Sequence, residues 1–149
     1  MSPFLKRIVS TDDSLSAAIT RIVLGLAILP HGLQKTIGLF GGYGFSGSMG
    51  FFTGTLGMPW IIALLVILGE SLGAISLILG FLTRFCAASL AVIMLGAISM
   101  AHWQNGFFMN WGGDQKGEGV EYHVLVIGMA LALVVSGAGR WSVDRKISA

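Results

Sequence analysis

Four long apolar stretches dominate the amino-acid sequence, and each is long enough to cross a lipid bilayer as a helix. A transmembrane helix needs about 20 mostly apolar residues, and such stretches occupy residues 15–35, 59–80, 83–103 and 119–137. Only 11% of the 149 residues are charged, whereas soluble domains carry about 25%. We therefore predict an all-α integral membrane four-helix bundle, in which residues 1–149 form a single transmembrane domain.

The segments between the predicted spans differ in length. The turn Phe81–Thr83 is so short that the second and third helices must be antiparallel neighbours. Residues 36–58 and 104–118 form longer loops, and both fall at the other end of the bundle. We expect these two loops to cover the outer face of the protein and to determine its specificity.

The basic residues are distributed unevenly between the two ends of the predicted bundle. Membrane proteins keep an excess of Lys and Arg on the cytoplasmic side. One end carries only Lys35 and Lys116, and the other carries Lys6, Arg7, Arg21, Arg84, Arg140, Arg145 and Lys146. We therefore predict a multi-pass protein of the bacterial inner membrane with both termini in the cytoplasm. No basic run or face is present, so nucleic acid is not an expected partner.

Glu70 is the polar residue predicted to lie deepest in the membrane. It follows Trp60 by ten residues, which corresponds to a depth of about 15 Å in a helix. Gly69 and Gly73 have the spacing that lets a neighbouring helix approach closely. Two interpretations stay open: a protonated Glu70 that joins helices through a hydrogen bond, or a carboxylate that handles protons or binds a ligand.

Other polar residues of the predicted spans gather toward the outer third of the membrane. They are His31, Gln34, Lys35, His102, Glu121 and His123, with Glu70 below them. His31 follows Pro30, which removes one helical hydrogen bond. Glu121 and His123 are two residues apart and point to nearly opposite sides of a helix. Because the inner half carries no such residues between its ends, we predict a polar ligand-binding pocket open to the periplasm, lined by these seven residues.

A weak internal similarity accompanies this pattern. Thr20-Arg21 and Thr83-Arg84 each lie near the start of an odd-numbered span, and each of those spans carries a histidine toward its outer end. Internal duplications recur in membrane folds. The similarity suggests a duplication without establishing one.

Six motifs together resemble the DoxX family of small four-helix membrane proteins, over residues 21–144. They are residues 31–35 (HGLQK), 68–73 (LGESLG), 79–84 (LGFLTR), 102–111 (HWQNGFFMNW), 117–123 (GEGVEYH) and 137–144 (GAGRWSVD). The resemblance implies a bacterial cytoplasmic-membrane protein associated with respiratory or sulfur-linked quinone redox systems. It also implies that Gly32 and Lys35 match the family's Gly-x-x-Lys element and that Glu70 matches its second-span glutamate. Related proteins are associated with the assembly of other membrane proteins.

Three functions remain open, and the sequence does not decide whether the protein is an enzyme. The first is a quinone- or redox-associated membrane component, in which Glu70 and His31 are the best catalytic candidates and Lys35 lies near the headgroup. The second is a non-catalytic subunit or assembly factor, whose partners are other membrane or respiratory subunits or a second copy. The third is a metal or haem site at His31, His102 and His123, although the spacing gives no ligand pair. The single cysteine, Cys86, excludes an internal disulfide and C-x-x-C chemistry.

Overall fold

The computed structural model describes residues 3–148, and all regular structure within that range is helical. The α-helices are α1 (Pro3–Val9), α2 (Leu15–Thr36), α3 (Gly44–Gly50), α4 (Trp60–Leu79), α5 (Thr83–Ala97), α6 (Glu121–Ser136) and α7 (Val143–Ser148). Short 3₁₀ or π segments are η1 (Leu39–Gly41), η2 (Phe51–Thr55), η3 (Ile98–His102) and η4 (Trp103–Asn105). The predicted all-α class is confirmed.

Three of the described helices are long and apolar enough to cross a membrane. They are α2, α4 and the continuous segment Thr83–Asn105, which consists of α5, η3 and η4. The fourth predicted span is the shorter apolar helix α6, whose 16 residues extend about 24 Å. The structure thus supports three membrane-length helices directly, and the fourth span stays a prediction.

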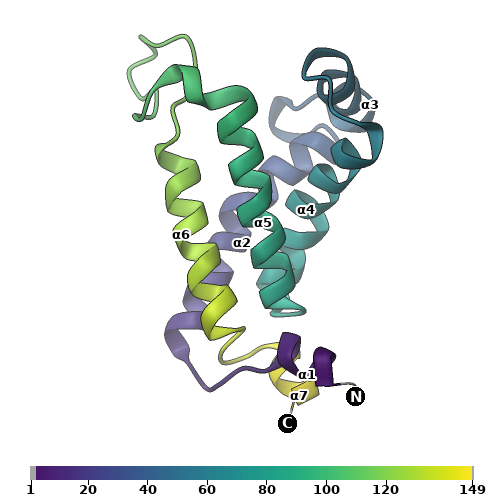
Figure 1. The fold of residues 1–149 in the computed structure, drawn as a ribbon, viewed down its shortest axis with the longest axis vertical. Coiled ribbons are helices and arrows are strands. Elements are labelled where there is room, and N and C mark those ends of the chain that lie inside the picture. Colours follow the sequence, from purple (N-terminus) through teal and green to yellow (C-terminus); the bar gives the residue numbers. More distant parts are fainter. Residues whose placement is uncertain (1–2, 149) are drawn as a thin grey trace.

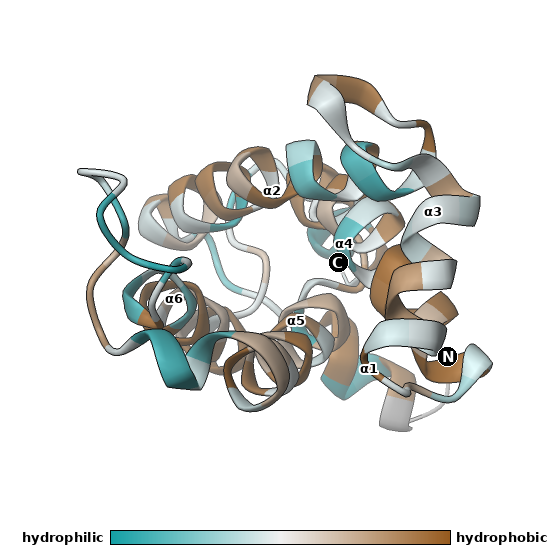
Figure 2. Ribbon diagram, turned by 90° about the horizontal axis from the view of Figure 1, so that it is seen from above, coloured by the Kyte–Doolittle hydropathy of each residue, from teal (hydrophilic) through white to brown (hydrophobic). Residues whose placement is uncertain are grey.

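Helices α2, α4, α5 and α6 run side by side along the long axis of the molecule (Figure 1). Helix α2 packs mainly on α4, and α5 packs mainly on α6. One core joins all four helices, through Leu24, Ile28, Ala74, Leu77, Leu90, Met94, Val126, Ala130 and Leu133. The outer segment α3–η2 adds a second cluster in which Met49 and Phe52 contact Ala63 and Ile67 of α4. Seen from above, hydrophobic residues dominate the helices (Figure 2).

Helices α2 and α4 cross at two glycines of α2. A Cβ added to Gly32 would lie 2.3 Å from the carbonyl oxygen of Glu70, and one added to Gly25 would lie 2.8 Å from that of Ala74. Gly69 instead faces the side chain of Ile93, and a Cβ on Gly73 would meet no described atom nearer than 3.9 Å. Close backbone contact therefore occurs at Gly25 and Gly32, and the expectation for Gly73 is wrong.

Arg21 lies inside α2 and is fully buried, although its charge suggested a flanking residue. A guanidinium has five N–H donors, and all of them bind backbone carbonyl oxygens. The acceptors are Leu77 and Ile78 at the end of α4, and Ala138, Arg140 and Trp141 in the segment before α7. This explains how a charged residue is buried here, because every donor is satisfied.

Arg84 makes an equivalent contact in the other helix pair. It donates to the carbonyl oxygens of Val134 and Val135 at the end of α6, and to that of Ser10. The arginines of the two Thr-Arg pairs noted in the sequence therefore each bind carbonyls in the last turn of the helix that packs beside them. This correspondence agrees with the duplication that the sequence suggested.

Two short helices that the sequence analysis did not predict, α1 and α7, pack together at the end of the bundle that holds both termini (Figure 1). Helix α7 supplies Asp144, which is 1% exposed. Its carboxylate accepts hydrogen bonds from the backbone N–H groups of Leu82 and Thr83, at 2.7 and 2.8 Å. Asp144 thus caps the start of α5, where free N–H groups favour an anion.

Candidate functional site

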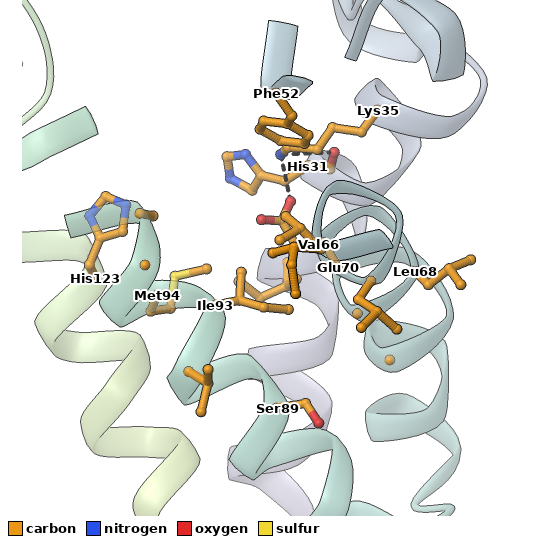
Figure 3. Close-up of a pocket in the computed structure, with 18 of the residues that line it drawn as sticks. His31, Lys35, Phe52, Val66, Leu68, Glu70, Ser89, Ile93, Met94 and His123 are labelled. Atoms are coloured by element: carbon orange, nitrogen blue, oxygen red, sulfur yellow. Dashed lines mark hydrogen bonds and ion pairs between the residues drawn. The ribbon is translucent and has the colours of Figure 1, made fainter. Parts of the chain in front are cut away.

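A cavity of about 1240 Å³ lies mainly between α4 and α5. Apolar side chains form most of its wall, and a group of polar side chains lies at its outer end. The polar residues at that end are His31, Lys35, Glu70, His102, Glu118, Tyr122 and His123. Figure 3 shows His31 and Glu70 on one side of the cavity and His123 on the other. Five of the seven predicted site residues are therefore brought together.

An ion pair between Lys35 and Glu70 forms one wall of the polar end. The Lys35 Nζ atom lies 2.5 Å from Glu70 Oε2, and the side chains are 23% and 8% exposed. The Gly32 contact brings the last turn of α2 level with the middle of α4, so Lys35 reaches Glu70 from one turn away. The Lys35 ammonium also donates to the carbonyl oxygen of His31, at 3.5 Å. An ammonium has three donors, so one remains for a ligand.

Four aromatic rings continue from this wall across the bundle. The ring of Tyr122 lies between His31 and His123, with centroid distances of 5.8 and 5.7 Å. The ring of His123 in turn lies against that of His102, with 4.2 Å between the ring centroids. The rings come from α2, α6 and the π segment η3. These rings therefore form a row of adjacent polar side chains at the outer end of the cavity.

Two polar atoms of this wall have no hydrogen-bond partner within residues 3–148. They are the hydroxyl of Tyr122 and Nδ1 of His123, and His123 is only 7% exposed. An unpaired buried polar atom costs about 1–3 kcal/mol. Both residues line the cavity, and the two unpaired atoms themselves are buried in the protein.

His102 is held in a fixed orientation by the outer loop. Its Nδ1 lies 2.9 Å from the carbonyl oxygen of Glu118, and a carbonyl only accepts, so Nδ1 carries the proton. In the neutral ring the other nitrogen is then an acceptor. The π segment η3 positions His102, and π turns are common at functional sites.

The structure places the other two predicted residues outside this cavity. Gln34 donates to the carbonyl oxygen of Phe40 at 3.2 Å and lines a separate outer pocket of about 270 Å³. Glu121 accepts from the backbone N–H of Met109 at 3.1 Å and so fastens the outer loop. His123 is buried in the bundle and Glu121 is not, and their spacing predicted that at most one of them would face the centre.

Two residues of the site were not singled out from the sequence. Tyr122 follows Glu121 directly, and Glu118 lies in the outer loop, so both were within a quoted motif. Tyr122 lacked any partner at helical spacing, and its contacts with His31 and His123 cross between elements. Only the GEGVEYH motif, where polar residues crowd the start of an apolar helix, could have indicated them.

The described part of the chain contains no group of three His, Cys, Asp or Glu side chains arranged to hold a metal ion. His102 and His123 are adjacent, but the ring of Tyr122 lies between His31 and His123. The three histidines are therefore not grouped around one point in the described part of the chain.

Comparisons with known proteins agree with the membrane character of the chain. The sequence model of the DoxX family matches residues 16–103, more than half of the chain. Inner membrane protein YphA of Escherichia coli (strain K12) is 28% identical over 131 residues, which cover 86% of this chain and 87% of that protein. No solved structure matches significantly.

Proposed function

This chain belongs to the DoxX family of bacterial inner-membrane proteins, and we propose that it is a redox-associated membrane component whose outer cavity binds a lipid-soluble quinone. A quinone combines an apolar body with two carbonyl oxygens. The cavity combines an apolar wall with polar groups at one end, as small-molecule sites usually do. The family resemblance, which implies quinone redox systems, supports the same choice.

One observation supports the proposal most strongly: polar side chains, two of them with an atom unpaired within residues 3–148, line one end of an otherwise apolar cavity. The Tyr122 hydroxyl can donate to a quinone carbonyl oxygen, and it can accept from the hydroxyl of the reduced form. Nδ1 of His123 can take either role according to its tautomer. The third donor of Lys35 can bind the other carbonyl. Glu70 keeps the ammonium paired in a medium that would otherwise disfavour its charge.

The proposal includes a topology of four spans, with α6 as part of the fourth, over about residues 119–137. Lys6 and Arg7 of α1 and Arg145 and Lys146 of α7 lie at the end that holds both termini. By the positive-inside rule that end is cytoplasmic. The loops 36–58 and 104–118 are then periplasmic. Helix α6 can complete the crossing if the bilayer thins modestly around it, or if the residues that flank it span the remaining thickness.

The test is photolabelling of the protein in lipid nanodiscs with an azido-quinone, followed by peptide mapping. We expect labelled peptides from the outer parts of α4, α5 and α6, with labelling abolished by excess unlabelled quinone. Glu70→Gln should reduce the labelling at least fivefold. Glu121→Gln is the matched control, because that carboxylate faces the outer loop, and it should label like the wild type.

The same labelling experiment can also contradict the proposal. Labelling that excess quinone does not displace, or that is the same in Glu70→Gln and Glu121→Gln, would rule out a specific quinone site. The non-catalytic subunit or assembly role would then be the better account. In that role the ion pair serves to hold α2 and α4 together.

A further inference from the structure

The cavity is much longer than a quinone headgroup requires. Its lining on α4 extends from Ile62 to Ser76, and on α5 from Phe85 to Ala97. The α4 part corresponds to about 21 Å along the helix axis. The charged residues and histidines of the lining occupy only the outer end, and Ser76 lies about 9 Å further along α4 than Glu70. The rest of the cavity is an apolar groove between α4 and α5, which we call the tail groove.

The tail groove opens sideways toward the lipid. Three of its lining residues are more than half exposed: Leu72 on α4, and Phe85 and Val92 on α5. All three lie within membrane-length helices. A molecule dissolved in the bilayer can therefore enter between α4 and α5 without passing through water.

Small residues give the tail groove its width. Gly73, Ala88 and Ser89 all line it. A Cβ added to Gly73 would meet nothing nearer than 3.9 Å in the described chain. The missing side chain of Gly73 therefore leaves space in the wall between α4 and α5.

The tail groove and the polar end belong to one continuous cavity. Its volume, about 1240 Å³, exceeds the 300–1,000 Å³ or so of pockets for drug-sized ligands. At its outer end lies His123, which is 7% exposed and has an Nδ1 atom unpaired within the described chain. A ligand that fills this cavity would carry a polar group at the outer end and an apolar chain along the groove.

We propose that the tail groove is the lateral entrance and chain-binding part of the site, so that the ligand is a long-chain lipid that enters from the bilayer with its polar headgroup leading. The inference rests on the proposed quinone function and specifies its substrate class as tail-bearing quinones. The headgroup lies between Lys35 and Tyr122, and the chain extends past Gly73 toward the Phe81–Thr83 turn.

The experiment uses the full chain in nanodiscs and three quinones with one headgroup and a methyl, a ten-carbon or a long isoprenoid tail. Their affinities are measured as mole fractions in lipid, by displacement of the azido-quinone. Gly73→Leu narrows the tail groove without touching the polar end, and Ser89→Leu does so from α5. Gly128→Leu is the matched control, because Gly128 is exposed on α6 and its added Cβ meets no atom within 4 Å in residues 3–148.

We expect the wild type to bind the long-tail quinone more tightly than the methyl quinone. Gly73→Leu and Ser89→Leu should weaken the binding of tail-bearing quinones about tenfold, because the added side chains occupy the space of the tail. Both variants should bind the methyl quinone within twofold of the wild type. Gly128→Leu should bind all three quinones with the affinity of the wild type.

Two results would overturn the inference while leaving the quinone site intact. One is equal affinity for all three quinones in the wild type, or an equal loss for all three in Gly73→Leu. The other is a phospholipid that co-purifies and that long-tail quinone does not displace, which would show that membrane lipid fills the tail groove. If no quinone binds to the wild type, the proposed function itself fails, and the inference fails with it.

Discussion

The ion pair between Lys35 and Glu70 should be energetically coupled, and a double-mutant cycle tests this. The variants are Lys35→Met, Glu70→Gln and the double substitution. Breaking a fully buried ion pair costs about 3–5 kcal/mol, because a charge is left without a partner. Lys35 is still 23% exposed, so we reduce the expected loss in the free energy of unfolding to about 2 kcal/mol for each single variant.

The double variant carries neither charge, so it should lose about 2 kcal/mol rather than the sum of about 4 kcal/mol. The coupling energy is then about 2 kcal/mol. The assay is unfolding of the protein in bicelles by increasing mole fractions of dodecyl sulfate, followed by far-UV circular dichroism.

A second cycle on the exposed ion pair between Arg140 and Asp13 provides the control. These side chains are 41% and 49% exposed, and exposed pairs contribute about 0–1 kcal/mol. Additive losses in the Lys35–Glu70 cycle, or a coupling no larger than that of the control, would refute the view that Glu70 and Lys35 hold each other charged beside the cavity.

Three further predictions follow from single contacts. Arg21→Lys keeps three of five donors and leaves two carbonyl oxygens unpaired, so it should lose about 2–4 kcal/mol of unfolding free energy. Arg140→Lys at the surface is the control and should lose under about 1 kcal/mol. Similar losses in the two variants would count against the Arg21 contact. Gly32→Ala inserts a Cβ 2.3 Å from a carbonyl oxygen of α4 and should lower the free energy of unfolding by about 2 kcal/mol or more in the same assay. Gly128→Ala, in open space, should raise it by up to about 1 kcal/mol. A Gly32→Ala variant as stable as the wild type would show that the helices do not cross there. Tyr122→Phe removes a hydroxyl with no partner in the described chain, so the free energy of unfolding should be unchanged or higher, while azido-quinone labelling should fall several-fold. A loss of stability with unchanged labelling would mean that the hydroxyl serves folding instead.

The membrane-length helices could be predicted because hydropathy and length are properties of each segment alone. Helix α2 covers Leu15–Thr36, against a prediction of 15–35, and α4 covers Trp60–Leu79, against 59–80. The burial of Arg21 could not be predicted in that way. Its five acceptors come from two separate parts of the chain, the end of α4 and the segment before α7, and only the folded arrangement brings them to one guanidinium.

In the candidate site, too, some residues could be predicted from the sequence and others could not. The cost of burying charge made Glu70 conspicuous in the sequence, and it lies in the cavity wall with Lys35. Helical spacing also separated His123 from Glu121. It could not tell which helix faces each residue across the bundle, so Tyr122 was missed and Gln34 was grouped with a cavity that it does not line. The close contact at Gly32 was likewise a property of the α2–α4 pair and not of either helix.

The most direct test of the central claim is a crystal structure, grown in a lipidic phase, of the protein with a brominated quinone whose bromine lies on the headgroup. Anomalous diffraction locates bromine independently of any assumption about the ligand. The account predicts one bromine position at the outer end of the cavity, among His31, Glu70 and His123. No bromine in the cavity at saturating quinone, with the Tyr122 hydroxyl and His123 Nδ1 bonded to each other or to other protein atoms, would contradict it.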